Sequence, residues 1–279
     1  MKILITGENG FLATEFKDYF SKGYKVSCLG RKSLDFTDAH AVDSFFNMNG
    51  YVDVVIHTAA DGGKRMVEDS FLTFSNNITM FSNLLKHKER YGMMFCFGSG
   101  AEYDRQYPVR DVKEDEFINC HPLDYYGLSK NIIAKEIVRT DCNIYNFRLF
   151  GCFGEREEPQ RFIKNSMRRI LEGKPVTIHR NIEMDFFYVK DLCAVIDFYI
   201  KNIDNIYLPK EVNMVYEEKL QLKEVANIIK ETTGSSVPVA TKISGTSGYY
   251  TGDASVLSSL GIPLKGLTYG IEEMYACLI

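Results

Sequence analysis

The 279-residue chain contains no tryptophan, only seven prolines and five histidines, and no long uninterrupted run of apolar residues. Without an apolar stretch of about 20 residues, no segment is predicted to span a membrane as a helix. A strand pattern begins at the N-terminus, where Lys2 is followed by Ile3, Leu4 and Ile5, so no secretory leader is expected. These observations predict a cytoplasmic protein.

Paired cysteines and metal-ligand spacings are also lacking. The seven cysteines are scattered, odd in number and without a C-x-x-C pair, which predicts free thiols in a reducing compartment. The histidines show no ligand spacing, so no metal site is predicted.

An excess of positive charge is missing too. The formal net charge is −4, which gives no field to gather nucleic acid or bind an anionic membrane. An anionic ligand must therefore be held by local basic residues and backbone amides. That requirement favours a small-molecule site, and neither nucleic acid nor membrane is expected as a partner.

The first half of the chain alternates short apolar runs with helical patterns, which predicts an α/β fold built on a doubly wound parallel sheet. Expected strands cover residues 3–5, 24–29, 52–57, 93–97 and 143–149, and expected helices cover 11–20, 38–46, 74–86 and 125–138.

Beyond Phe150 the alternation breaks. Helices are expected at 161–172 and 222–232, and one more strand and helix of the main sheet at 185–189 and 192–203. We predict a larger domain from residues 1–152 plus 185–205, and a smaller, discontinuous α/β lobe from 153–184 plus 206–279.

A glycine-rich turn separates the first expected strand from the first helix. Gly7, Gly10 and Ala13 follow a G-x-x-G-x-x-A spacing. Glycines here let the backbone turn sharply and approach a pyrophosphate, which then rests on the helix N-terminus. The pattern predicts a Rossmann-type dinucleotide site.

Tyr126 and Lys130 lie four residues apart on an expected helix, so the phenol and the ammonium share one face. A nearby cation favours the phenolate and brings tyrosine proton exchange closer to neutral pH. Tyr125 is five residues from Lys130 and turns away from it. Taken alone, an ordinary exposed helix pair is the alternative interpretation; the strand end at Ser99, which precedes the pair, favours the catalytic one.

These motifs resemble the extended short-chain dehydrogenase/reductase family, the NAD-dependent epimerases, dehydratases and reductases of sugar nucleotides. Further matches occur in the same order along most of the chain. They are the segments 34–38, 57–60, 77–85, 148–154 and 185–191.

The resemblance implies a set of site residues. As catalytic residues it implies Ser99, Tyr126 and Lys130. Implied cofactor contacts are Gly7, Asn9, Gly10, Phe11, Leu12, Arg31, Lys32, Asp35, Phe36, Thr58, Ala59, Ala60, Asn77, Tyr126 and Lys130. Implied substrate contacts are Ser99, Gly100, Ala101, Arg161 and Arg168; for the basic residues around Arg168, a solvated helix face is the alternative.

The resemblance also implies a homodimer. Ile78, Phe81 and Leu85 would supply an apolar stripe for a four-helix interface, or would face their own sheet instead.

Several positions depart from the family patterns. Gly151 replaces a usual Asn and Met184 a usual Arg, which weakens the assignment of substrate contacts. The nearest pattern is that of GDP-fucose synthases, but Ala101 stands where their Cys does and Arg161 aligns with their His. Gly100 and Ala101 also replace the Asp-Glu pair of the dehydratases. Epimerisation of the GDP-fucose type and dehydration are therefore disfavoured.

The function that remains favoured is reduction of a nucleotide-linked 4-keto-6-deoxy sugar. Two alternatives stay open, a sugar-nucleotide epimerase acting by transient oxidation at C4 and a non-catalytic NADP-binding protein.

NADP is the expected cofactor, because Arg31 and Lys32 follow the second strand and the first acid is Asp35. Gly30 is expected to leave room for the 2′-phosphate.

Overall fold

The computed structural model describes all residues except 64–66, 244 and 279. The chain divides into two compact units. Unit 1 comprises residues 1–105, 114–148 and 196–212, and unit 2 comprises 106–113, 149–195 and 213–279. The domain boundaries predicted from the sequence, 1–152 plus 185–205 and 153–184 plus 206–279, stay a prediction. The compact units differ from them chiefly in assigning 106–113 and 185–195 to unit 2.

A six-stranded sheet, most of whose residues belong to unit 1, has the strand order β11-β6-β4-β3-β1-β2, which confirms the predicted fold class. The strands are β1 (Lys2–Thr6), β2 (Lys25–Leu29), β3 (Val52–His57), β4 (Tyr91–Ser99), β6 (Ile144–Leu149) and β11 (Glu211–Met214). Strands β2, β1, β3 and β4 pair in parallel, and Thr6 lies opposite both Leu29 and His57. The strand order reverses at β1 and β3, and ligands of open α/β sheets bind at the carboxyl ends of such a switch point.

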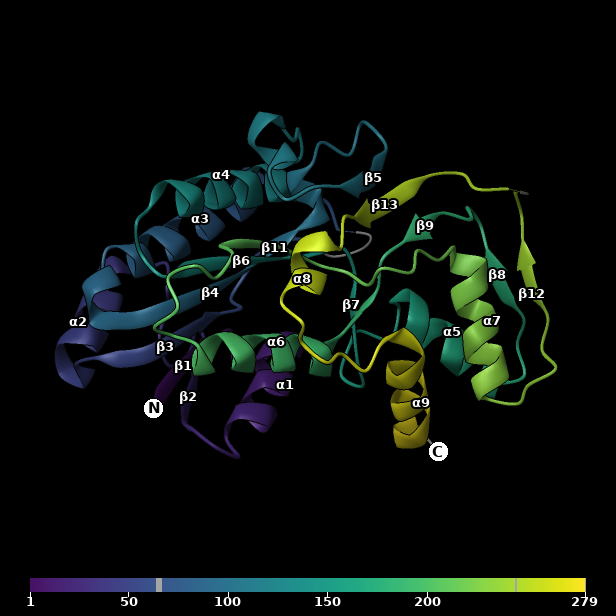
Figure 1. Cartoon of the computed structure of the whole chain (residues 1–279), viewed down its shortest axis with the longest axis horizontal. Helices are drawn as coiled ribbons and strands as arrows, with labels where there is room; N and C mark the ends of the chain where they lie inside the picture. Colours follow the sequence, from purple (N-terminus) through teal and green to yellow (C-terminus); the bar gives the residue numbers. More distant parts are fainter. Residues whose placement is uncertain (64–66, 244, 279) are drawn as a thin grey trace. The chain divides into compact units, whose positions relative to one another are not determined.

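Helices cover the sheet of unit 1, with α3 and α4 over one face and α1 over the other (Figure 1). The helices are α1 (Phe11–Phe20), α2 (Ala39–Asn49), α3 (Phe71–Leu85) and α4 (Tyr125–Arg139), with short 3-10 turns η1 (Lys88–Arg90), η2 (Gly100–Glu102) and η3 (Glu116–Asn119). Asp38 caps α2 by accepting from the His40 and Ala41 amides, and Asp124 caps α4 through the Gly127 amide. These caps fix where α2 and α4 begin.

The predicted strand at 185–189 is not part of the main sheet. Its residues form the short β10 (Phe187–Tyr188), which pairs with β7 (Cys152–Phe153) in a separate two-stranded sheet. Helix α6 (Val189–Lys201) begins immediately afterwards and leaves the strand only two residues long. The sixth strand of the main sheet is β11, which the apolar pattern did not reveal.

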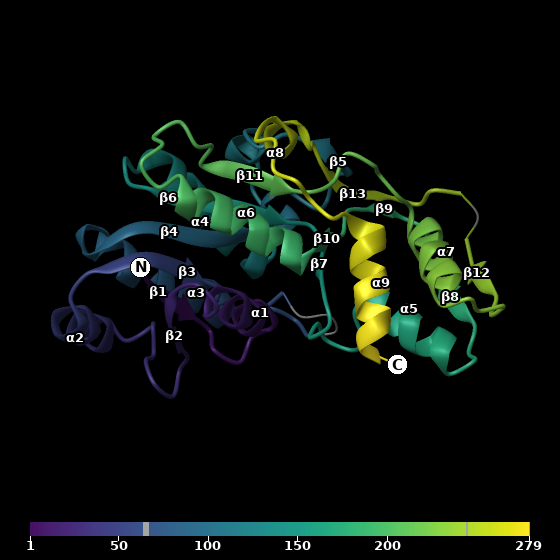
Figure 2. The same ribbon diagram turned by 60° about the horizontal axis from the view of Figure 1, so that its bottom comes forward.

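Unit 2 contains α5 (Phe162–Leu171), α7 (Leu222–Thr232), α8 (Ser255–Ser259) and α9 (Leu267–Leu278). Helix α7 packs against both α5 and α9 (Figure 2). Strand β8 (Val176–Ile178) pairs with β12 (Val239–Thr241), and a three-stranded sheet joins β5 (Val109–Val112), β13 (Tyr249–Gly252) and β9 (Glu183–Met184). Nowhere in the described residues is there a helix with the length and apolar character to cross a membrane.

The apolar stripe expected to form a dimer faces the protein's own core. Phe81 is fully buried, and Ile78 and Leu85 pack against the same core cluster. The exposed apolar side chains near the start of α3 and along α4 are different ones. Phe71 is 64% exposed, and its ring meets that of Tyr125 edge-on at 6.1 Å.

The exposed faces of α3 and α4 supply a revised prediction for the homodimer. Phe71, Leu72, Tyr125 and Ile132 are all exposed there, and burying them against a second copy would remove apolar surface from water. Light scattering is expected to give the mass of a dimer, and Phe71→Asp combined with Ile132→Asp is expected to give a monomer. A monomeric mass for the parent protein would contradict the prediction.

Candidate active site

The glycine turn between β1 and α1 forms a tight cradle. Gly7 has a positive φ of 81°, and a Cβ placed there would lie 3.0 Å from the Ala59 backbone. Gly10 precedes α1 without any side-chain cap on the first turn, and its amide donates to the Gly7 carbonyl at 2.8 Å. Since neither glycine tolerates a side chain comfortably and the helix amides are uncapped, these residues fit the pyrophosphate of a dinucleotide.

Asn9 is exposed beside this turn, and Phe11 and Leu12 form the half-buried start of α1. All of the residues predicted in the turn therefore lie at the carboxyl end of β1.

Thr6 joins the carboxyl ends of β1 and β3. Its hydroxyl lies 2.9 Å from His57 Nδ1 and accepts a hydrogen bond from the Ala59 amide at 2.9 Å. The Thr58 hydroxyl donates to the Thr6 carbonyl. Burial, assisted by the positive charge of Lys130, lowers the pKa of His57 to about 3. His57 is therefore neutral at physiological pH, which makes it a structural residue rather than a proton carrier.

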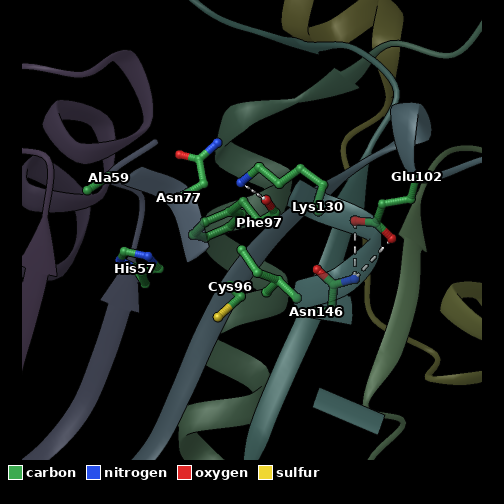
Figure 3. Close-up of a pocket in the computed structure, with 10 residues that line it drawn as sticks. His57, Ala59, Asn77, Cys96, Phe97, Glu102, Lys130 and Asn146 are labelled. Atoms are coloured by element: carbon green, nitrogen blue, oxygen red, sulfur yellow. Dashed lines mark hydrogen bonds between the residues drawn. The ribbon is translucent and has the colours of Figure 1, made fainter. Parts of the chain in front are cut away.

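Lys130 is held at the end of β4. Its ammonium donates to the Phe97 carbonyl at 2.9 Å, as Figure 3 shows, and lies 5.7 Å from the centre of the Tyr126 ring. Burial lowers the pKa of Lys130 below its usual range, although electrostatic interactions with Cys96 and Glu102 oppose that effect. The structure thus brings the predicted Tyr126 and Lys130 together.

Ser99 ends β4 and begins the η2 turn. Its hydroxyl accepts a hydrogen bond from the Ala101 amide at 3.2 Å, and its own amide donates to Glu102 Oε1 at 3.0 Å. Gly100 and Ala101 are buried in the turn, and a Cβ on Gly127 would lie 2.5 Å from the Ala101 carbonyl oxygen. Ser99 is therefore held by the same turn that packs against the first turn of α4.

Asn77 braces the loop that follows β3. It is buried in α3, donates to Ser129 Oγ at 3.1 Å and to the Asp61 carbonyl at 3.0 Å, and accepts from the Asp61 amide at 2.7 Å. Ser129 in turn donates to the Tyr126 carbonyl at 2.7 Å. A Cβ on Gly63, which also has a positive φ, would lie 2.9 Å from the Tyr126 ring. Asn77 thus positions the loop and α4 relative to one another rather than offering a free amide.

A buried charge cluster lies behind Ser99. Arg148 is fully buried, and its guanidinium donates to Glu102 Oε2 at 2.6 Å and to Glu211 Oε2 at 2.5 Å. Asn146 Nδ2 also donates to both carboxylates (Figure 3 shows the contacts with Glu102). The pairing of Glu102 with Arg148 turns its carboxylate away from the reacting groups. No local sequence pattern indicates a role for Glu211, because its partner Arg148 is 63 residues away.

The cluster holds two carboxylates against one guanidinium, so one carboxylate retains a proton. Burial, with the charge of Glu102, raises the pKa of Glu211 to about 8 despite the opposing effect of Arg148. Glu211 Oε1 has no hydrogen-bond partner among the described residues, which makes it the natural carrier of that proton.

Glu211 therefore makes stability depend on pH. The folded state holds the proton more tightly than the unfolded chain, so the stabilisation is complete below pH 4.5 and is lost as the pH rises toward about 8. Within this window the free energy of unfolding is expected to fall by about 1.4 kcal/mol per pH unit from this group. Glu211→Gln is expected to flatten the slope in urea titrations between pH 6 and 9; an unchanged slope would contradict the protonated state.

The adenosine side of the expected cofactor site lies after β2. Arg31 and Lys32 are exposed, whereas Asp35 accepts hydrogen bonds from the Thr37 amide and hydroxyl at 2.9 and 2.7 Å. These bonds, and to a smaller extent the charge of Arg31, lower the pKa of Asp35. Phe36 is a core side chain, so only its backbone is left for a ligand.

The remaining predicted residues lie in unit 2 and already have ion-pair partners. Arg161 precedes α5 and lies 3.4 Å from Glu157, and Arg168 in the last turn of α5 lies 3.7 Å from Glu172. Both side chains stay about half exposed, at 41% and 49%. A phosphate ligand would have to compete with these glutamates, and the role of both arginines in substrate binding stays a prediction.

The described part of the chain has no group of three or more His, Cys, Asp or Glu residues arranged to hold a metal ion. The chemistry available at the site consists of the Tyr126 phenol, the Lys130 ammonium, the Ser99 hydroxyl and the glycine cradle.

A parallel sheet with a glycine cradle at its switch point and a Tyr-x-x-x-Lys pair beside it defines a dinucleotide-dependent enzyme of the short-chain dehydrogenase type. The sequence profile of the NAD dependent epimerase/dehydratase family matches residues 3–214. The chain belongs to this family, whose members are oxidoreductase-type enzymes that use nicotinamide cofactors. The resemblance stated from the motifs is thereby confirmed.

Individual relatives are distant. An uncharacterized UDP-glucose epimerase, YtcB from Bacillus subtilis, is 22% identical over 88% of this chain and 87% of its own length. Two further curated relatives are each 24% identical, and the chain spans 53% and 57% of their lengths.

Solved structures share the fold more completely. A GDP-mannoheptose C4 reductase from Campylobacter jejuni, solved with NADP bound, has a TM-score of 0.85 at 21% identity, covering 99% of this chain and 97% of that one. A UDP-glucose 4-epimerase from Thermus thermophilus in complex with NAD has a TM-score of 0.77 at 21% identity and covers both chains fully, at 100%. At this identity the likeness shows the fold alone.

Proposed function

We propose that this protein is an NADPH-dependent reductase of a nucleotide-linked 4-keto-6-deoxy sugar. The observation that carries the proposal is the Lys130 ammonium, fixed at the Phe97 carbonyl and beside the Tyr126 ring. A proton donor tuned in this way, next to a cradle for a dinucleotide, meets the needs of carbonyl reduction.

Each residue of the triad has a separate task. When bound, the cofactor supplies a hydride to the ketone carbon. Tyr126 donates its phenolic proton to the ketone oxygen, which becomes the alcohol. The positive charge of Lys130 favours the tyrosinate left behind, and the Ser99 hydroxyl donates a hydrogen bond to the substrate oxygen.

Reduction is favoured over other reactions of the family by the residues next to Ser99. Gly100 and Ala101 carry no group that exchanges protons, and Glu102 is held by Arg148 at 2.6 Å. Dehydration and epimerisation at the carbons beside the ketone both need such a group. Hydride delivery to C4 and proton delivery to its oxygen need only the triad and the cofactor.

A sugar-nucleotide epimerase that oxidises and re-reduces C4 is the second candidate. It would use the same three residues and keep its cofactor, and one curated relative is named as a UDP-glucose epimerase. The solved structures include both a C4 reductase and a 4-epimerase, so the shared fold does not decide between the two.

A screen of 4-keto sugar nucleotides with NADPH separates these functions. We expect absorbance at 340 nm to fall in proportion to the sugar nucleotide added, because a reductase consumes one cofactor per turnover. Interconversion of two 4-hydroxy sugar nucleotides with no added cofactor would instead indicate the epimerase. We further infer a cytoplasmic protein, since the described cysteines are free thiols suited to a reducing compartment. The homodimer is inferred separately, from the exposed apolar side chains of α3 and α4.

Cofactor choice within this proposal rests on Arg31 and Lys32. Both are exposed immediately after β2, where a 2′-phosphate of close to two negative charges would meet them. We infer a preference for NADPH over NADH, with Arg31 as the main determinant because its planar guanidinium binds phosphate through two hydrogen bonds.

A further inference from the structure

Glu8 lies in the glycine turn, but its side chain turns toward the end of β2. The amides of Gly7 and Glu8 both donate to the Leu29 carbonyl, at 2.8 and 3.3 Å. A Cβ built on Gly30 would lie 2.7 Å from Glu8 Cγ and 3.0 Å from Glu8 Oε1. The space that Gly30 was expected to leave for a phosphate is therefore occupied by a carboxylate.

The charges around this point are mixed. Arg31 and Lys32 supply two exposed cations, and Asp35 supplies a carboxylate already bonded to Thr37. Glu8 is half-buried, and its negative charge also adds to the burial effect that raises the pKa of the Cys28 thiol on β2. Of these charged groups, Glu8 is the one that contacts Gly30 itself.

In this fold the adenosine ribose of a dinucleotide lies at the end of the second strand, where a carboxylate accepts hydrogen bonds from its hydroxyls. That carboxylate usually comes from a residue at the end of β2 or just after it. Here these positions hold Leu29, Gly30 and Arg31, none of which is acidic. Glu8 reaches the same place from the glycine turn. A phosphate on the ribose 2′-oxygen would bring two negative charges toward this carboxylate.

We propose that Glu8 is a specificity-determining residue for the cofactor, opposing Arg31. Its carboxylate accepts hydrogen bonds from an unphosphorylated ribose and repels a 2′-phosphate. Glu8 therefore weakens the preference for NADPH that Arg31 creates, so NADH also binds as a usable second cofactor. The inference rests on the proposed function, since it assumes that a nicotinamide dinucleotide binds at the glycine cradle.

The test measures dissociation constants for NADPH and NADH separately, by the fluorescence of the reduced nicotinamide, without any substrate. Glu8→Gln keeps the size of the side chain and removes its charge. We expect NADPH to bind about tenfold more tightly, equivalent to ~1.4 kcal/mol of repulsion removed, and NADH to bind more weakly. Arg31→Ala is expected to do the opposite to NADPH and to leave NADH nearly unchanged.

Two control variants make the result specific. Asp204→Asn removes one exposed carboxylate from the turn after α6 and is expected to leave both constants unchanged. Glu8→Asp keeps the charge and is expected to preserve the discrimination against NADPH better than Glu8→Gln does.

An equal change for both cofactors in Glu8→Gln, or no change in either, would overturn the role of Glu8. Failure of the parent protein to bind either cofactor would instead overturn the proposed function, so the two failures are distinguishable.

Discussion

A Tyr126→Phe variant is expected to lose about 10²–10⁴-fold in turnover while it binds the nicotinamide cofactor almost as well as the parent protein. The substitution removes only the phenolic oxygen and its proton, and leaves the ring beside Gly63 and the Lys130 ammonium in place. Steady-state rates and cofactor titrations on the same preparations provide the measurement.

The neighbouring tyrosine offers a matched control. Tyr125 is 41% exposed and meets Phe71 edge-on, so Tyr125→Phe removes a hydroxyl of the same kind from outside the site. This variant should turn over at close to the parent rate. A near-normal rate in Tyr126→Phe would remove Tyr126 from the role of general acid.

Lys130→Met should impair both turnover and cofactor binding. The ammonium donates to the Phe97 carbonyl and supplies the positive charge that favours the tyrosinate. Methionine keeps much of the side-chain volume but provides neither a donor nor a charge. If turnover falls while cofactor affinity is unchanged, Lys130 acts on Tyr126 alone and does not contact the cofactor.

The largest effect on stability is expected from Arg148→Ala, which should lower the free energy of unfolding by about 3–5 kcal/mol. The fully buried guanidinium separates Glu102 from Glu211 and donates to both. Without it, the two buried acids Glu102 and Glu211 face one another with no compensating cation. Urea titration at pH 7 measures the change, with Arg139→Ala as a control because Arg139 is exposed in the last turn of α4.

If Arg148→Ala lowers the free energy of unfolding by less than ~1 kcal/mol, the buried charge cluster is contradicted. Such a small loss would mean that both carboxylates reach water or take up protons at little cost. Raising the pH from 6 to 9 should enlarge the loss, because Glu211 then gives up the proton that its raised pKa retains.

Local signals account for what could be predicted from the sequence. The glycine turn, the Tyr126–Lys130 pair and the strands around them depend on spacings of a few residues, and the structure has each of these elements. The resemblance implies Asn77 as a cofactor contact, whereas in the structure its side-chain amide is bonded to Asp61 and Ser129.

The features that escaped prediction depend on contacts between distant residues. Strand β11 begins with Glu211, an acid that is buried only because Arg148 pairs with it from another strand. Ile78 and Leu85 have the spacing of a surface stripe, yet they pack on the core of their own unit. Glu8 occupies the space at Gly30 because two amides of its turn bond to the Leu29 carbonyl, which no spacing reveals.

The reaction is tested most directly by following the hydrogen that leaves the cofactor. NADPH carrying deuterium in both positions of the nicotinamide C4 is incubated with the protein and a 4-keto-6-deoxy sugar nucleotide, and the product is examined by NMR and mass spectrometry. We predict one deuterium at C4 of the sugar for each NADPH oxidised, and no such transfer in Tyr126→Phe. Product formed without net oxidation of NADPH, or without deuterium at C4, would contradict the assignment as a C4 reductase.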